Sequence, residues 1–149
     1  MQRNEPIRKY PIQPVPSVHT AVFRNNQVLV VKRANEPSKG RWSLPGGVVE
    51  LGEKLWDAAR RELLEESEVE CNIEGLVDIV DNIIPDSEGR IQYHYLVIYL
   101  FGSYIGGIPT PGSDASDVAW ITYEEFPDLD MNPGVKQVLP KAFSLKHNC

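Results

Sequence analysis

Residues 44–69, LPGGVVELGEKLWDAARRELLEESEV, restrict the fold of this chain more than any other stretch. The stretch opens with LPGG at 44–47, which cannot be helical. Proline fixes φ and lacks an amide donor, and glycine permits conformations that other residues avoid. From residue 54 to residue 66 the residues are good helix formers, and neither Gly nor Pro interrupts them. The pattern predicts a glycine loop that leads, a few residues later, into an acidic helix.

Three carboxylates gather on one side of this predicted helix. At 100° per residue, Glu62, Glu65 and Glu66 fall within an arc of about 100°. Like charges at this spacing destabilise a helix by roughly 0.2–0.5 kcal/mol per pair, and the macrodipole disfavours acids near the C-terminal end. A hard divalent cation removes both penalties, because carboxylate oxygens are the ligands that Mg²⁺ and Mn²⁺ prefer. We interpret the cluster, with a glycine-loop carbonyl beside it, as a metal site; the competing interpretation is a solvated acidic face.

The apolar side chains of the same helix occupy a neighbouring arc, which we predict to be its buried face. They are Leu55, Trp56, Ala59 and Leu63. Ala58 lies next to the acids on the wheel, and its small side chain leaves space beside them.

The spacing of the fixed residues resembles the Nudix box, G-x5-E-x7-R-E-U-x-E-E-x-G-U, in which U is a bulky apolar residue. Gly47 and Glu53 occupy the first two positions, and residues 61–66 supply R-E-U-x-E-E. Only the second glycine differs, because Glu68 stands in its place. That glycine usually ends the helix in the left-handed conformation, which other residues adopt at a cost. The difference therefore concerns the helix end more than the metal ligands.

The resemblance, which extends from about residue 17 to residue 126, implies an α/β fold, a Nudix-type α/β/α sandwich with a mixed β-sheet. It also implies Mg²⁺-dependent hydrolysis of the pyrophosphate bond in a nucleoside diphosphate linked to another group, X. The segments PSVHTAVF, RANEPSKGRWSLPGG and YHYLVIYLFG are most similar to the ADP-ribose pyrophosphatase-like branch, which favours an ADP-ribose-like substrate. The alternatives are a (d)NTP pyrophosphohydrolase that removes unusual nucleotides, and an inert Nudix module that only binds nucleotides.

The family match also assigns roles to residues of the box. The expected metal ligands are the carbonyl of Gly46 and the carboxylates of Glu62, Glu65 and Glu66. Mg²⁺ is the expected cofactor, with Mn²⁺ as a substitute, and the number of ions is left open. Arg61 and Glu53 are expected to assist catalysis by orienting the carboxylates through salt bridges. The competing interpretation of Arg61 is a surface pair with Glu65, which would contribute little.

The general base and the substrate contacts are less determined. Within the box, Glu65 or Glu66 is the favoured base. Acids outside the box are the alternatives, namely Glu88, Asp114 and Asp117. The candidates for contact with the substrate are Arg33, Lys39, Arg41 and Gly47.

Length and composition agree with one compact enzyme domain, and the resemblance implies a small-molecule nucleoside diphosphate derivative as its partner. A chain of 149 residues has single-domain length, and 42% of its residues are hydrophobic. The formal charge of −6 argues against a nucleic-acid polymer as partner. Only Cys71 and Cys149 contain thiols, which argues against a disulfide framework and indicates a cytoplasmic location. No apolar run reaches about 18 residues, so no membrane partner is expected, and a homodimer is left open.

The remaining sequence predicts the strands, the loop and the second helix that surround this site. Residues 1–16 contain four prolines and are expected to form an extended arm, followed by one domain over residues 17–149. Strands are predicted at 18–23, 28–32, 71–80, 91–101 and 118–121, with a long loop at 102–116. A second helix should start at Asn132-Pro133, and Pro140 should interrupt or end it.

Overall fold

The computed structural model describes residues 7–36 and 38–147, so residues 1–6 of the predicted arm lie outside the described residues. Its strands are β1 (Val15–Arg24), β2 (Gln27–Arg33), β3 (Trp42–Ser43), β4 (Gly46–Val48), β5 (Glu70–Pro85), β6 (Ile91–Gly106) and β7 (Ala115–Thr122). Its helices are α1 (Leu55–Ser67), the short 3-10 helix η1 (Phe126–Asp128) and α2 (Pro133–His147). The division into an arm and one domain stays a prediction.

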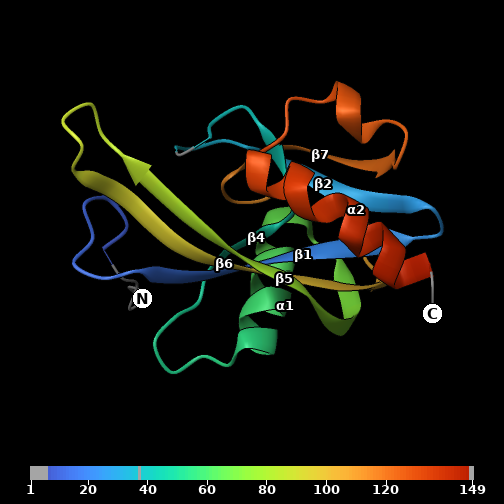
Figure 1. Ribbon diagram of the computed structural model, residues 1–149. Helices are drawn as coiled ribbons and strands as arrows, with labels where there is room; N and C mark the ends of the chain where they lie inside the picture. Colours follow the sequence, from blue (N-terminus) through green and yellow to red (C-terminus); the bar gives the residue numbers. More distant parts are fainter. Residues whose placement is uncertain (1–6, 37, 148–149) are drawn as a thin grey trace.

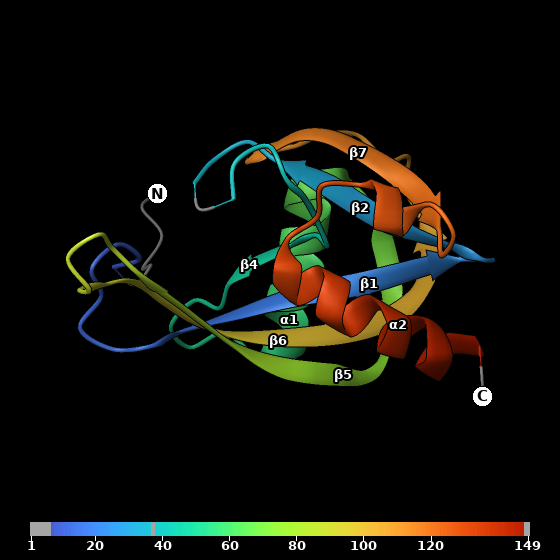
Figure 2. The same cartoon turned by 45° about the horizontal axis from the view of Figure 1, so that its top comes forward.

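The strands form one mixed sheet between two helices. The order is β3-β2-β1-β6-β5, with β4 paired to β1 and β7 paired to β2. The pairing of β1 with β6 is parallel, and the other strand pairs are antiparallel. α2 lies across one face of the sheet and α1 lies on the opposite face (Figures 1 and 2). The predicted α/β/α sandwich with a mixed sheet is confirmed.

The sequence of β1 explains why both faces of the sheet are covered. Successive side chains of a strand point to opposite faces. Ala21 and Phe23 belong to the buried cluster that contains the α2 side chains, whereas Val18 and Val22 belong to the cluster that contains the α1 side chains. Because apolar burial stabilises by about 25 cal/mol per Å², a central strand that is apolar on both sides favours two covering helices.

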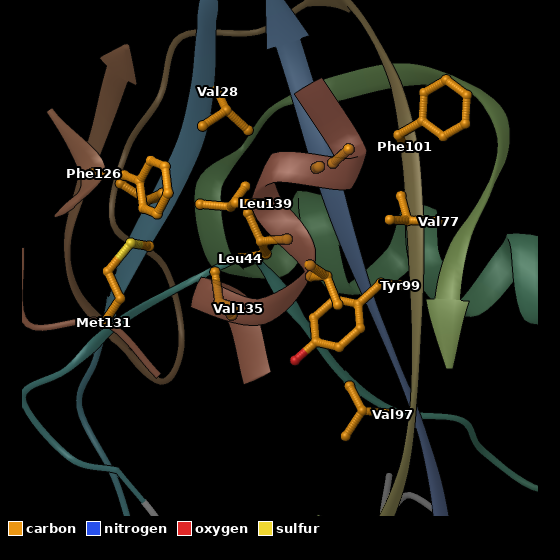
Figure 3. Packing of buried hydrophobic residues seen from close by; sticks show 14 of the residues in the cluster. Val28, Leu44, Val77, Val97, Tyr99, Phe101, Phe126, Met131, Val135 and Leu139 are labelled. Carbon is orange, nitrogen blue, oxygen red and sulfur yellow. The ribbon is translucent and has the colours of Figure 1, made fainter. Parts of the chain in front are cut away.

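Some side chains of the cluster on the α2 side also line the cavity that is described below. Figure 3 shows Val135 and Leu139 of α2 in the same buried cluster as Val97 and Tyr99 of β6. Burial raises the pKa of the Tyr99 phenol well above its ordinary value, so this group stays protonated. The core thereby places one neutral, polar hydroxyl close to the cavity described below.

Helix α2 starts as predicted but does not end at its proline. The side chain of Asn132 accepts a 2.9 Å hydrogen bond from the amide of Gly134, which is the expected N-cap contact. The prediction that Pro140 interrupts the helix is wrong, because α2 continues to residue 147. Pro140 is exposed, while Leu139 and Ala142 on either side of it are fully buried. Burial of this face compensates for the lost amide, whose absence costs about 3 kcal/mol.

The strands after the box are longer than predicted, and the loop predicted at 102–116 is too long. β6 continues to residue 106 and β7 begins at residue 115. Gly102 does not break the ladder, because it allows a close approach of β5: a Cβ at Gly102 would lie 2.3 Å from the carbonyl oxygen of Asn72. Glycine here permits strand contact rather than a turn.

The shorter loop between β6 and β7 closes the C-terminal end of α1. The amides of Thr110 and Gly112 donate hydrogen bonds of 2.9 Å to the carbonyls of Ser67 and Glu66. A Cβ at Gly112 would lie 1.8 Å from the carbonyl oxygen of Glu65, so the approach requires glycine. Carbonyls that a helix end leaves unpaired are satisfied here by the loop. The last turn of α1, which holds the acids, is thereby fixed.

The buried side of α1 differs from the predicted one. Trp56 is 37% exposed, so its predicted burial is wrong. The buried residues are Ala58, Ala59, Glu62, Leu63, Glu66 and Ser67. The buried arc includes two acids, which a hydrophobic pattern assigns to solvent because burial of a charge is costly. The side of α1 that packs against the sheet is therefore shifted around the helix axis, so that it includes the two carboxylates and leaves Trp56 exposed.

Helix α1 ends at Glu68, the residue that replaces the second glycine of the box. Glu68 has φ 58° and ψ 24°, and its amide donates a 2.9 Å hydrogen bond to the carbonyl of Leu64. This is the left-handed C-terminal conformation that glycine usually supplies. The chain therefore keeps the turn without the residue that adopts it most easily.

Substituting Glu68→Gly should stabilise the protein, because glycine avoids a left-handed penalty of about 1–2 kcal/mol. The gain is reduced by the larger conformational entropy that glycine gives to the unfolded chain, leaving about 1 kcal/mol. The midpoint of denaturant unfolding measures it. Glu68→Ala is the matched control, because it removes the charge but keeps the Cβ. An equal gain in both variants would assign the effect to charge, and a lower midpoint in Glu68→Gly would contradict the prediction.

Candidate active site

The acids of α1 lie against the glycine loop that precedes the helix. Glu62 and Glu66 are only 8% and 7% exposed. The amide of Gly46 donates a 3.1 Å hydrogen bond to a carboxylate oxygen of Glu66. The Gly47 backbone approaches Glu62 so closely that a Cβ there would lie 2.6 Å from both carboxylate oxygens. Loop and helix therefore meet as the sequence predicted, and the structure adds that the two carboxylates are buried there.

Arg61 links the acids of the box. It donates two hydrogen bonds to Glu53, from Nε at 2.7 Å and from Nη2 at 2.9 Å. Nη1 contacts Glu62 at 2.8 Å and Glu65 at 3.3 Å, and Nη2 also donates to the carbonyl of Val48 at 3.1 Å. The Arg61 side chain is 21% exposed, so this is not an isolated surface pair. A planar guanidinium with several fixed donors can hold carboxylates in defined orientations.

A cavity of about 420 Å³ opens beside this cluster. Arg33, Arg41 and Gly47, three of the four predicted substrate contacts, lie in its walls. Gly47 separates the cavity from Glu62, so the cavity adjoins the acids through backbone.

Comparison with known proteins agrees with this geometry. A family profile described as the NUDIX domain matches residues 13–142. The chain belongs to the Nudix hydrolase family. It is accordingly a hydrolase of the class that acts on nucleoside diphosphates linked to another group.

Two relatives illustrate the range of names in this family. A Methanocaldococcus jannaschii protein named ADP-ribose pyrophosphatase is 31% identical over 125 residues, which cover 83% of this chain and 72% of that protein. A Mycobacterium tuberculosis protein provisionally named 8-oxo-dGTP diphosphatase 2 is 35% identical over 114 residues, which cover 76% of this chain and 77% of that protein. In two further relatives, from Bacillus subtilis and Acinetobacter baylyi, the match spans 63% and 56% of their lengths.

Solved structures show the same fold. A MutT Nudix hydrolase from Burkholderia pseudomallei superposes with a TM-score of 0.76 at 24% identity, covering 87% of this chain and 98% of that chain. The Nudix domain of NrtR from Shewanella oneidensis, solved in complex with ADP ribose, gives a TM-score of 0.74 at 22% identity, covering 90% and 89%. The described part of this Nudix domain contains no helix that is long and apolar enough to cross a membrane.

The oxygen donors of the box fit a hard divalent cation. Glu62 and Glu66 are buried, and burial raises the pKa of Glu66 to about 8, with the negative charges of Glu62 and Asp114 adding to the rise and the Gly46 amide opposing it. A nearby cation relieves such crowding of negative charge. Within residues 7–36 and 38–147, however, no group of three Asp, Glu, His or Cys side chains is arranged as a ready metal site. Arg61 and the Gly46 amide hold the carboxylate oxygens instead, so the four predicted ligands remain a prediction.

His19 is a cavity residue that sequence reasoning missed. It lies in β1 opposite Gly46 of β4, and its Nδ1 is 2.9 Å from the carbonyl oxygen of Leu44. Because a carbonyl only accepts, Nδ1 carries the hydrogen, and burial lowers the pKa of His19 to about 4. The imidazole is therefore neutral at pH 7. The available signal was that Ser17 and His19 stand at alternate positions of a strand in which Val18, Ala21 and Val22 are apolar.

The three loop acids considered as general bases lie in different places. Glu88 is exposed at the β5–β6 turn, 3.4 Å from Arg90. Asp117 is exposed on β7, where its carboxylate accepts a hydrogen bond from the amide of Val118. Asp114 alone among the three contributes to the raised pKa of Glu66. The fold therefore brings Asp114, and not the other two, towards the box acids.

Proposed function

We propose that this Nudix domain hydrolyses the pyrophosphate bond of ADP-ribose or a closely similar nucleoside diphosphate derivative, with Mg²⁺ as cofactor. The observation that carries the proposal is the arrangement of one cavity: Arg33 and Arg41 line its walls, and the carboxylate cluster adjoins it through Gly47. Guanidinium groups suit phosphate oxygens because they present several donors in one plane. Similarity to the Methanocaldococcus jannaschii protein named ADP-ribose pyrophosphatase supports the choice of ADP-ribose as the substrate.

In this proposal different residues bind the diphosphate, hold the metal ion and orient the carboxylates. Arg33 and Arg41 hold the diphosphate, and the backbone at Gly47 leaves room for it beside the acids. Glu62, Glu65 and Glu66, with the carbonyl of Gly46, hold Mg²⁺. When bound, the ion supplies Lewis acidity at the phosphoryl oxygens and lowers the pKa of water. Glu53 holds Arg61, which in turn keeps Glu62 and Glu65 oriented.

Glu65 is the proposed general base. Its carboxylate is half-buried, and Arg61 contacts it at 3.3 Å, so it is oriented but still accessible to water. The proton of the attacking water passes to Glu65, and the products of ADP-ribose hydrolysis are AMP and ribose 5-phosphate. Asp114 is the alternative base, since its charge acts on Glu66.

Mg²⁺ binding should become stronger as the pH rises. Because the pKa of Glu66 is raised from 4.5 to about 8, the metal-free folded state holds a proton that the unfolded chain has lost at neutral pH. The protonated Glu66 side chain therefore contributes to the stability of the metal-free fold. This contribution is fully present below the pKa of Glu66 in the unfolded chain, and it is lost as the pH rises through the pKa in the folded protein. Mg²⁺ needs the carboxylate, so its stabilising effect grows over the same range.

Thermal unfolding with EDTA and with millimolar Mg²⁺, at pH values on both sides of the Glu66 pKa, measures this dependence. The rise in melting temperature caused by Mg²⁺ should be larger at the higher pH. Glu66→Gln is the control, because its side chain does not titrate. An equal Mg²⁺ effect at both pH values in the parent protein would contradict the role of Glu66.

Hydrolysis assays separate this proposal from its alternatives. ADP-ribose with Mg²⁺ should yield AMP, whereas a nucleotide-binding module would bind ADP-ribose without releasing AMP. The Mycobacterium tuberculosis relative favours a second candidate, a pyrophosphohydrolase of altered nucleoside triphosphates. A higher kcat/KM for 8-oxo-dGTP than for ADP-ribose would establish that candidate, and no product from either substrate with Mg²⁺ or Mn²⁺ would overturn the enzyme proposal.

A further inference from the structure

A second, shallower depression continues from the cavity; we call it the basic groove. The cavity and the basic groove share Ser38, Arg41 and Ile84 in their walls. Tyr95 lines the cavity and Tyr93 lines the groove, and their rings are stacked with centroids 6.2 Å apart. The two depressions therefore form one continuous surface, and a ligand held at the diphosphate can extend into the groove.

Positive charge is concentrated along this surface. Its cationic lining residues are Arg8, Lys9, Arg33, Lys39 and Arg41, and its acidic lining residues are Glu36 and Asp81. The whole chain has a formal charge of −6, so this local excess of cations is opposite to the average. The summed positive potential of several such side chains attracts anions over a longer distance than one ion pair does.

Two of these cations come from the segment before β1, which is held in place. The amide of Tyr10 donates a 2.8 Å hydrogen bond to the carbonyl of Gln92, and its hydroxyl donates a 2.7 Å hydrogen bond to Asp86. The Arg90 guanidinium lies 5.2 Å from the centre of the Tyr10 ring. In Figures 1 and 2 this blue segment lies beside the turn between β5 and β6. Anchoring at Tyr10 thereby holds the adjoining residues in place, Arg8 at the cavity and Lys9 at the basic groove.

We propose that the basic groove binds a phosphate additional to the scissile diphosphate, so that the preferred substrates are phosphorylated nucleoside diphosphate derivatives. This inference rests on the proposed function. Arg33 and Arg41, with the metal site, already account for the two phosphates of an ordinary substrate. Lys9 and Lys39 lie beyond them in the groove, where neither forms an ion pair with a described residue. A third phosphate would be a negatively charged partner for these two ammonium groups.

Binding of three related ligands tests this inference. ADP-ribose is compared with its 2′-phosphate and with its 1″-phosphate, which place the extra group on the adenosine ribose and on the distal ribose. Dissociation constants are measured by titration calorimetry in EDTA, so that no turnover interferes. At least one phosphorylated ligand should bind about 10-fold more tightly than ADP-ribose. Equal or weaker binding of both would overturn the inference.

Variants identify the groups responsible. Lys39→Gln and Lys9→Gln should each reduce the preference for the phosphorylated ligand several-fold. Tyr10→Ala should also reduce it, although it removes no cation, because it releases the anchored segment. Lys141→Gln is the matched control, since this lysine lies on α2 near Asp78 and outside the groove. A preference that survives in both groove lysine variants would overturn the assignment to the groove.

The same ligands, incubated with Mg²⁺, separate this inference from the proposed function. Release of AMP from ADP-ribose without any preference for the phosphorylated ligands would support the hydrolase and overturn the groove. Preferential binding of a phosphorylated ligand without hydrolysis of any of the three would support the groove and overturn the proposed function. Preferential binding together with faster hydrolysis would support both.

Discussion

Replacing Glu66 by glutamine should lower kcat/KM for ADP-ribose hydrolysis by roughly 100- to 1,000-fold while the fold stays intact. The amide side chain occupies nearly the same volume and can still accept the hydrogen bond from the Gly46 amide, which is 3.1 Å long in the parent protein. It cannot supply a charged oxygen to a cation. Glu66 is 7% exposed, and its burial disfavours the charged form, so loss of the charge should not destabilise the metal-free protein.

Kinetics at saturating Mg²⁺ and thermal unfolding in EDTA measure the two halves of this prediction. Glu62→Gln should behave in the same way towards substrate, because Glu62 is also buried next to the glycine loop. Glu124→Gln is the matched control, since this exposed glutamate follows β7 and lies outside the box. Activity of Glu66→Gln near that of the parent at saturating Mg²⁺ would remove Glu66 from the metal site.

The sequence was sufficient to predict the position of the acids, because their placement depends on local periodicity. Glycine loop, helix and carboxylates lie within one continuous stretch, so a helical repeat determines which acids share a face. The same pattern left open how the helix ends at Glu68, and the structure shows the left-handed conformation there. Arg61 and Glu53 were also predictable, because the helix and its preceding turn hold them within one short segment.

Features that depend on distant segments could not be obtained in this way. The burial of Glu62 and Glu66, and the exposure of Trp56, depend on how α1 is rotated against the sheet. Hydrophobic patterns place charged residues outside, so they fail where a functional site buries charge. The approach of Asp114 to the box depends on hydrogen bonds between the β6–β7 loop and the end of α1.

The residues that line the cavity could not be predicted from local sequence patterns either, because they come from distant segments. Arg33 is the last residue of β2, and Arg41 directly precedes β3. His19 comes from β1, and Tyr95 comes from β6. They meet because β1 lies between β2 and β6 in the sheet, a parallel neighbour of β6 although far from it in sequence. Local patterns do not specify which strands become neighbours.

Gly47→Ala should lower kcat/KM by roughly 100-fold with little effect on stability, because it displaces a carboxylate rather than the backbone. The added Cβ would lie 2.5 Å from the carboxylate carbon of Glu62. That carboxylate is the end of a flexible side chain, so it can move away, and its 2.8 Å contact with Arg61 is then lost. Gly47 lies in β4, where alanine fits the backbone without strain. The barrier to hydrolysis therefore changes more than the free energy of unfolding.

A double-mutant cycle tests whether Gly47 acts through Glu62. Kinetic constants are measured for the parent, Gly47→Ala, Glu62→Gln and the double variant, with thermal unfolding as the check on folding. If the alanine acts by displacing the Glu62 carboxylate, it should cost much less once that carboxylate has been replaced, so the two losses are not additive. Additive losses would instead mean that Gly47 provides room for the substrate itself. A melting temperature lowered as strongly as activity would show that the Cβ disturbs β4, contrary to the prediction.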